Sequence, residues 1–231
     1  MKLRAVTGKV DIPSAGHAAS ASGAALREFA YNEIKRRIIS CEFRPGEALH
    51  EAQVAALLGL GRTPVHQALH RLEMEGLVSI MPRKGVLVSP LSLNDVLDMV
   101  EVRLTNEMLC VALAIERAHV VDIKAMRDIV ECSPALIEQR DIAGLASLDL
   151  KFHTAMSAAS RNRVLADLLR NLHEKQARFW FLSLSDPVHL NNVYQEHMCI
   201  IDAFERRDVA AAQQAIHAHI DAFRKNIIRT I

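Results

Sequence analysis

The second half of the chain consists of consecutive stretches that all have helical periodicity, separated by short breaks. Aromatic residues make up only 4% of the chain, and Ala, Leu, Ile and Val supply most of its apolar side chains. This composition favours long helices over a β-sandwich. We therefore predict a mainly α protein with an all-helical antiparallel bundle over residues 91–231, its helices at 93–118, 122–139, 141–158, 162–183, 189–207 and 209–230.

The first 90 residues have a different pattern. Residues 14–25 are almost entirely Ala, Ser and Gly, so we expect residues 1–25 to form a flexible tail. Residues 26–90 predict three helices and, around the sequence MPRKG, a small β-hairpin. The second and third helices, at 51–58 and 62–75, are joined by a short turn that contains glycine. This order describes a winged helix-turn-helix.

The net charge of the chain is only +1, but the charges are unevenly distributed. Residues 1–90 carry 12 Lys+Arg against 8 Asp+Glu, whereas residues 91–231 carry 16 against 19. The apolar runs are far shorter than the ~18 residues that a membrane span needs, and no apolar stretch follows the basic residues near Met1. We expect a cytoplasmic protein that has no membrane partner. The cysteines form no CxxC pair, so we expect reduced thiols at Cys41, Cys110, Cys132 and Cys199.

The third predicted helix begins with candidate contacts to double-stranded DNA. A recognition helix enters the major groove by its N-terminal residues, where an arginine such as Arg62 can bind a guanine edge. Thr63 and the free amides of the helix N-terminus suit a phosphate. At the hairpin tip, two cations precede a glycine that would let the backbone approach the duplex. Taken singly, these are ordinary exposed side chains, but their order predicts DNA binding by Arg62, Thr63, His66, Arg83, Lys84 and Gly85.

The run FRPGEALHEAQVAALLGLGRTPVHQALHRLEMEGLVSIMPRKGVLV resembles the winged-helix domain of GntR-type bacterial transcription regulators. The resemblance covers residues 26–90 and implies binding to operator DNA. Gly61 stands where the family has a serine N-cap, a change that costs only a few tenths of a kcal/mol. His66 replaces the usual arginine, so the operator sequence does not carry over. His66 and His70 are spaced like a metal pair, but no third ligand lies nearby in sequence and we expect His66 to face DNA.

The bundle contains a different set of histidines. Asp149 and His153 are four residues apart in a predicted helix and therefore project side by side, as two metal ligands can. His197 and the pair His217 and His219 lie in two further amphipathic helices, so three helices can bring ligands to the core. Residues two apart on a helix point about 200° apart. Because His219 lies on the apolar stripe and His217 does not, we predict that His219 faces inward. Any one of these histidines alone would be more typical of an ordinary core residue.

The segments EVRLTNEMLCVALAIERA, LDLKFHTAMSAASRN, YQEHMCIIDAFERRD and AIHAHIDAF resemble the FCD domain of the FadR-type subfamily. The resemblance implies a divalent metal such as zinc, nickel or manganese. Three imidazoles and one carboxylate leave positions on a six-coordinate metal for a small carboxylate effector, which Arg103 would clamp at its other end. Alternatively, Arg103 forms an exposed ion pair with Glu107. Asn106 departs from the usual leucine. The implied metal ligands are Asp149, His153, His197 and His219.

The sequence thus predicts a metabolite-responsive transcription regulator that binds an imperfect palindrome as a homodimer. Most regulators of this kind are repressors. Two alternatives stay open. The helical domain could be a metal-free dimerisation domain in which the histidines are structural. A metal-dependent hydrolase is the other alternative, although no dedicated general base is apparent beside the predicted ligands.

Overall fold

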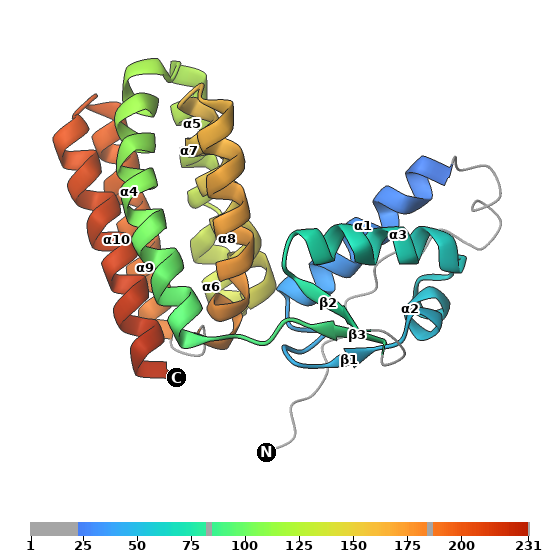
Figure 1. The fold of residues 1–231 in the computed structure, drawn as a ribbon. Coiled ribbons are helices and arrows are strands. Elements are labelled where there is room, and N and C mark those ends of the chain that lie inside the picture. The colour runs from blue at the N-terminus through green and yellow to red at the C-terminus, as the bar shows by residue number, and fades with distance from the viewer. Residues whose placement is uncertain (1–22, 82–84, 184–186, 231) are drawn as a thin grey trace. The chain divides into compact units, whose positions relative to one another are not determined.

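The computed structural model describes residues 23–81, 85–183 and 187–230 (Figure 1). The chain forms two compact units. The first comprises Met1–Lys35 and Ala48–Leu87, and the second comprises Arg36–Glu47 and Val88–Ile231. None of the helices in the described residues combines the length and the apolar character that crossing a bilayer requires.

The first unit has the predicted winged helix-turn-helix elements. The helix α3 buries Val65, Ala68, Leu69 and Leu72, whose spacing places them on one helical face. Strand β3 lies between β1 and β2 and pairs antiparallel with β1. Strand β1 has only two residues and is not among the predicted elements. Helix α1 begins at Gly23, within the segment expected to be a tail. Residues 1–22 lie outside the residues that the structure describes. The bounds are α1 (Gly23–Ile39), β1 (Ala48–Leu49), α2 (Glu51–Leu58), α3 (Arg62–Met74), β2 (Val78–Met81) and β3 (Gly85–Val88).

Two glycines in this unit have conformations that other residues rarely adopt. Gly59 ends α2 in the left-handed region, with φ +64°, and so makes the turn toward α3. Gly85 begins β3 with φ +97°, and a Cβ at this position would lie 2.8 Å from the carbonyl oxygen of Leu49. The close pairing of β3 with β1 therefore requires glycine at position 85. The sequence predicted that Gly85 allows a close approach of the backbone to DNA, whereas the structure gives a reason within the sheet itself.

The second unit is the predicted helical bundle (Figure 1). Helix α4 packs against α7, α8 and α10, while α9 packs against α5, α6 and α10. Their buried apolar side chains form one large core, to which Phe152, Met156, Ile200 and Phe204 contribute. The bounds are α4 (Leu93–Arg117), α5 (Val120–Val130), α6 (Ser133–Gln139), α7 (Ile142–Ala159), α8 (Arg163–Ser183), α9 (Pro187–Glu205) and α10 (Val209–Thr230).

The single helix predicted over 122–139 is wrong, because this segment forms α5 and α6 with a break at Glu131 and Cys132. Pro134 lies in the first turn of α6. Proline is tolerated there because the first amides of a helix have no partner within it, but it would interrupt the hydrogen bonds of a continuous helix. Periodicity alone does not reveal such a break, since apolar residues continue on both sides of it.

Candidate functional site

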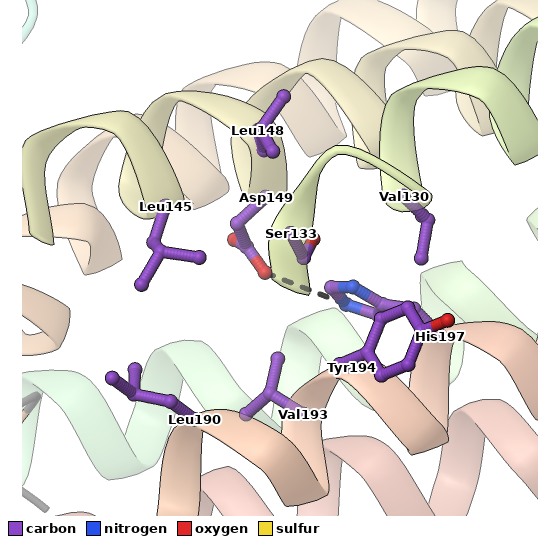
Figure 2. Close-up of a pocket in the computed structure, with 9 residues that line it drawn as sticks. All are labelled: Val130, Ser133, Leu145, Leu148, Asp149, Leu190, Val193, Tyr194 and His197. Atoms are coloured by element: carbon purple, nitrogen blue, oxygen red, sulfur yellow. Dashed lines mark ion pairs between the residues drawn. The ribbon is translucent and has the colours of Figure 1, made fainter. Parts of the chain in front are cut away.

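Four predicted metal ligands meet in the core of the bundle. Asp149 and His153 lie one turn apart on α7, His197 comes from α9 and His219 from α10, and one ligand atom of each lies within 4.8 Å of the others. Asp149 Oδ1 is 3.5 Å from His197 Nε2, the ion pair drawn in Figure 2, and 3.8 Å from His153 Nε2. The three imidazoles are buried, whereas Asp149 is partly accessible. The structure thus brings together the four residues that the sequence predicted.

The donor set fits a divalent metal. Asp149 Oδ1 and His197 Nε2 are buried and have no hydrogen-bond partner among the described residues, an arrangement that is costly unless another group completes it. Burial lowers the pKa of His197 well below its ordinary value and that of His219 to about 3, so both rings are neutral at physiological pH. Neutral imidazoles can coordinate without first losing a proton. One carboxylate and three imidazoles suit zinc, nickel or manganese.

The helical phase of α10 agrees with the choice of His219 over His217. His219 is buried in the cluster, whereas His217 is exposed. His219 Nδ1 lies 2.8 Å from Glu196 Oε2, which leaves the Nε2 atom of the same ring for coordination. Burial raises the pKa of Glu196 to about 7.

The predicted effector contact, Arg103, is buried beside the four predicted metal ligands. Its Nε donates to Glu107, and its Nη1 donates to Gln176 Oε1 at 2.9 Å. Its Nη2 lies 3.4 Å from His153 Nε2. The ion pair with Glu107 therefore exists, but it is enclosed and not exposed as the alternative interpretation had it. The structure places Arg103 next to a predicted metal ligand.

Three further polar residues of this region were not singled out by the sequence as a site. Glu107, His173 and Gln176 are all buried around Arg103. Burial alone would raise the pKa of Glu107, but Arg103, His153 and His173 hold it well below its usual range. Burial lowers the pKa of His173 to about 3. The sequence pattern could have indicated that Glu107 is buried, because this residue lies on the apolar face of α4 with the other buried residues of that helix.

A small cavity adjoins two of the predicted metal ligands, Asp149 and His197 (Figure 2). Its volume is about 20 Å³, which is room for roughly one water molecule or ion. An organic effector would need side chains to move before it could enter. The walls are mostly apolar, with hydroxyl groups from Ser133 and Tyr194, and the other lining residues are Val130, Leu145, Leu148, Leu190 and Val193.

The predicted DNA contacts on α3 are accessible. Arg62, Thr63 and His66 are exposed at the start of this helix, on the side away from its buried face. His66 Nδ1 lies 2.9 Å from Glu51 Oε1, and its ring packs against that of His70. Within the described residues, the groups of three or more potential metal ligands do not include His66 or His70. Arg83 and Lys84 lie outside the described residues.

Two family models match this chain. Residues 26–88 match the model described as bacterial regulatory proteins, gntR family. Residues 98–222 match the model of the FCD domain.

Curated relatives agree with this assignment, and solved structures share the fold. The chain is 27% identical to the HTH-type transcriptional regulator YdhC of Bacillus subtilis over 83% of this chain and 86% of the relative. It is also 27% identical to the HTH-type transcriptional repressor GlaR of Escherichia coli, over 82% and 90% respectively. The structure of E. coli McbR/YncC matches with a TM-score of 0.81 at 19% identity, covering 88% of this chain and 97% of that one. A GntR regulator from Rhodococcus matches with a TM-score of 0.76 at 18% identity, covering 89% and 98%. Both structural matches support the fold.

Proposed function

The chain belongs to the gntR family of bacterial regulatory proteins and carries an FCD domain, and we propose that a small carboxylate bound at a metal site in that domain controls its binding to operator DNA. The protein is a DNA-binding transcription regulator and not an enzyme. The metal dependence, the carboxylate and the direction of control are the proposed parts.

One observation carries the proposal: Arg103 Nη2 lies 3.4 Å from His153 Nε2, so a guanidinium adjoins the predicted metal ligands. A divalent ion held by Asp149, His153, His197 and His219 would supply Lewis-acid attraction for a carboxylate oxygen. Arg103 would offer the same anion charge-assisted hydrogen bonds. A carboxylate is therefore the ligand chemistry that both groups favour.

We propose that two copies of the chain bind one operator. Helix-turn-helix dimers read half-sites that are one DNA turn apart, ~34 Å, in a palindromic sequence. The start of α3, with Arg62, Thr63 and His66, would enter the major groove, and Arg83, Lys84 and Gly85 would form the adjacent wing contact. Because bacterial operators lie in the cytoplasm, we place the protein there. Repression is the favoured direction, since the similar GlaR is named a repressor.

The effector would act through a difference in affinity between two states of the regulator. Arg103 lies on α4, which follows β3 after the short segment 89–92. A ligand that bridges the metal site and Arg103 would pull on the helix that directly continues from the winged domain. Any effect of the ligand on DNA affinity must be matched by an equal effect of DNA on ligand affinity.

The test is a thermal-shift screen of small carboxylates on zinc-loaded protein, followed by operator titrations monitored by fluorescence anisotropy. A true effector at 100 times its Kd should stabilise the protein by ~2.7 kcal/mol and change its affinity for DNA. The same screen on His219→Ala should show no such response, whereas His217→Ala should respond like the wild type. Wild-type protein that binds no divalent metal would support the metal-free dimerisation domain instead.

A further inference from the structure

The carboxylate of Glu107 lies between Arg103 and the predicted metal ligand His153. We propose that Glu107 is a positioning residue that holds His153 as its Nδ1–H tautomer and so reserves the Nε2 lone pair for coordination. This inference rests on the proposed metal site, and it adds a role for a residue outside the four ligands.

The first support is the surroundings of the Glu107 carboxylate. Its Oε2 lies 3.2 Å from His153 Nδ1, and its Oε1 accepts from Arg103 and lies 3.3 Å from His173 Nε2. The carboxylate forms a buried ion pair with Arg103, and both oxygens of an ionised carboxylate are acceptors. Glu107 Oε2 and His153 Nδ1 do not meet hydrogen-bond geometry, but a lone pair on Nδ1 would face a negatively charged oxygen at 3.2 Å, so the contact favours a hydrogen on this nitrogen.

The second support comes from the opposite edge of the same ring. Arg103 Nη2 lies 3.4 Å from His153 Nε2, and a guanidinium has only hydrogens to offer. The Nε2 atom must therefore present its lone pair. Two neighbours of different charge, on two edges of one imidazole, thus require the same tautomer. This agreement describes the metal-free protein, because an ion on Nε2 would use the lone pair that faces Arg103.

Outer carboxylates of this kind are known to orient metal-bound histidines and to raise their basicity. Here the carboxylate is also paired with Arg103, the predicted effector contact. If an effector displaced Arg103, the Glu107 carboxylate and the His153 ring that it faces would also be affected. This coupling would not require direct contact between the effector and the metal.

A rival interpretation uses the same atoms as a second metal position, because ligand atoms of Glu107, His153 and His173 lie within 4.8 Å of one another. The Arg103 guanidinium argues against it, since the Glu107 oxygen that faces His173 already accepts a hydrogen bond from this guanidinium. Coordination through His153 Nδ1 would also displace the hydrogen that the surroundings require.

The first experiment reads the tautomer in the wild-type protein after chelation of metals. Long-range ¹H–¹⁵N correlation spectra distinguish the two nitrogens, and loss of signals in His153→Gln assigns the ring. We expect the hydrogen on Nδ1. A hydrogen on Nε2 would overturn the proposal, and this result does not depend on any Glu107 variant being folded.

The second experiment titrates Zn²⁺ into wild type, Glu107→Gln and the control Glu101→Gln, an exposed residue on the same helix. Loss of the orienting carboxylate should weaken zinc binding about 10- to 100-fold, and the control should match the wild type. Unchanged affinity in folded Glu107→Gln would refute the positioning role. Two zinc ions per wild-type chain, with one lost in Glu107→Gln, would favour the rival second site. If the wild type binds no zinc, the proposed function fails, while the tautomer measurement still decides this inference.

Discussion

Arg103 and Glu107 lie one turn apart on α4 and form an ion pair that is buried against residues of α7 and α8. Removing one partner of a buried pair leaves an uncompensated charge, so Arg103→Ala should lower the free energy of unfolding by about 3–5 kcal/mol. Lys124→Ala breaks an exposed pair with Asp128 on α5 and should cost less than about 1 kcal/mol. Urea denaturation of both variants checks this, and equal effects would contradict the buried pair.

The effector role of Arg103 is therefore tested with a substitution that destabilises the fold less than alanine does. Arg103→Lys keeps the positive charge beside Glu107 but loses the planar donor fork that matches a carboxylate. We expect this variant to retain zinc and operator binding and to lose the effector's influence on DNA affinity. Operator titrations with and without the effector from the carboxylate screen measure that influence. Wild-type sensitivity in Arg103→Lys would remove the bidentate contact from the mechanism.

The metal content of ligand variants tests the cluster itself. We expect one divalent ion per chain, lost or greatly weakened in His153→Ala and His197→Ala because each removes one of four ligands. His217→Ala should keep the ion, since His217 is exposed. Elemental analysis of the purified proteins gives the stoichiometry. Comparable loss in His217→Ala would show that the cluster does not hold the ion.

Stability of the metal-free protein should fall as the pH falls from 6.5 to 4.5. Burial lowers the pKa of His173 and His219 from 6.5 to about 3 and that of His197 well below 6.5, so these rings take up protons only on unfolding. Glu196 acts in the opposite direction, because burial raises its pKa to about 7, but three rings outnumber one carboxyl group. Each net proton taken up on unfolding is worth about 1.4 kcal/mol per pH unit.

Urea unfolding in the presence of a chelator, at several pH values in this window, measures the slope. His173→Gln should flatten it by about one proton, and His217→Gln should leave it unchanged. A protein that becomes more stable toward pH 4.5 would show that these buried rings are not neutral in the folded state.

Operator affinity should depend on Arg62 at the start of α3. If Arg62 binds a base edge, Arg62→Ala costs roughly 1–3 kcal/mol on the specific site. Arg163→Ala is a suitable control, because this arginine is highly exposed on α8 and outside the winged domain. Binding should also weaken strongly as salt rises, since phosphate contacts release counterions. Anisotropy titrations test both points, and an Arg62→Ala variant with unchanged affinity would rule out this contact.

The sequence predicted those parts of the site that depend on spacing within one helix. The phase of α10 separates His219 from His217, and a four-residue step pairs Asp149 with His153. The environment of Arg103 was not predictable in this way. His173 and Gln176 lie on α8, and a helical pattern does not state which neighbouring helix each buried residue will meet. The enclosed state of Glu107 likewise depends on contacts between helices.

For the fold, the strong periodic segments were predicted and the weak local ones were not. The helices of the bundle and α3 carry repeated apolar positions that fix their type. Strand β1 is too short to show any period, and its presence depends on pairing with β3. The break before α6 depends on one proline in a segment that is apolar on both sides.

The four clustered ligands are distributed over α7, α9 and α10, with His219 far along the chain from Asp149. During synthesis, a ribosome-bound chain that has released α4 to α9 would already hold Arg103, Glu107 and three of the ligands. It would still lack the imidazole that completes the set. Under the proposed function, the winged domain would therefore be made well before the chain could respond to its signal, and newly made regulator would become inducible only after α10 had docked.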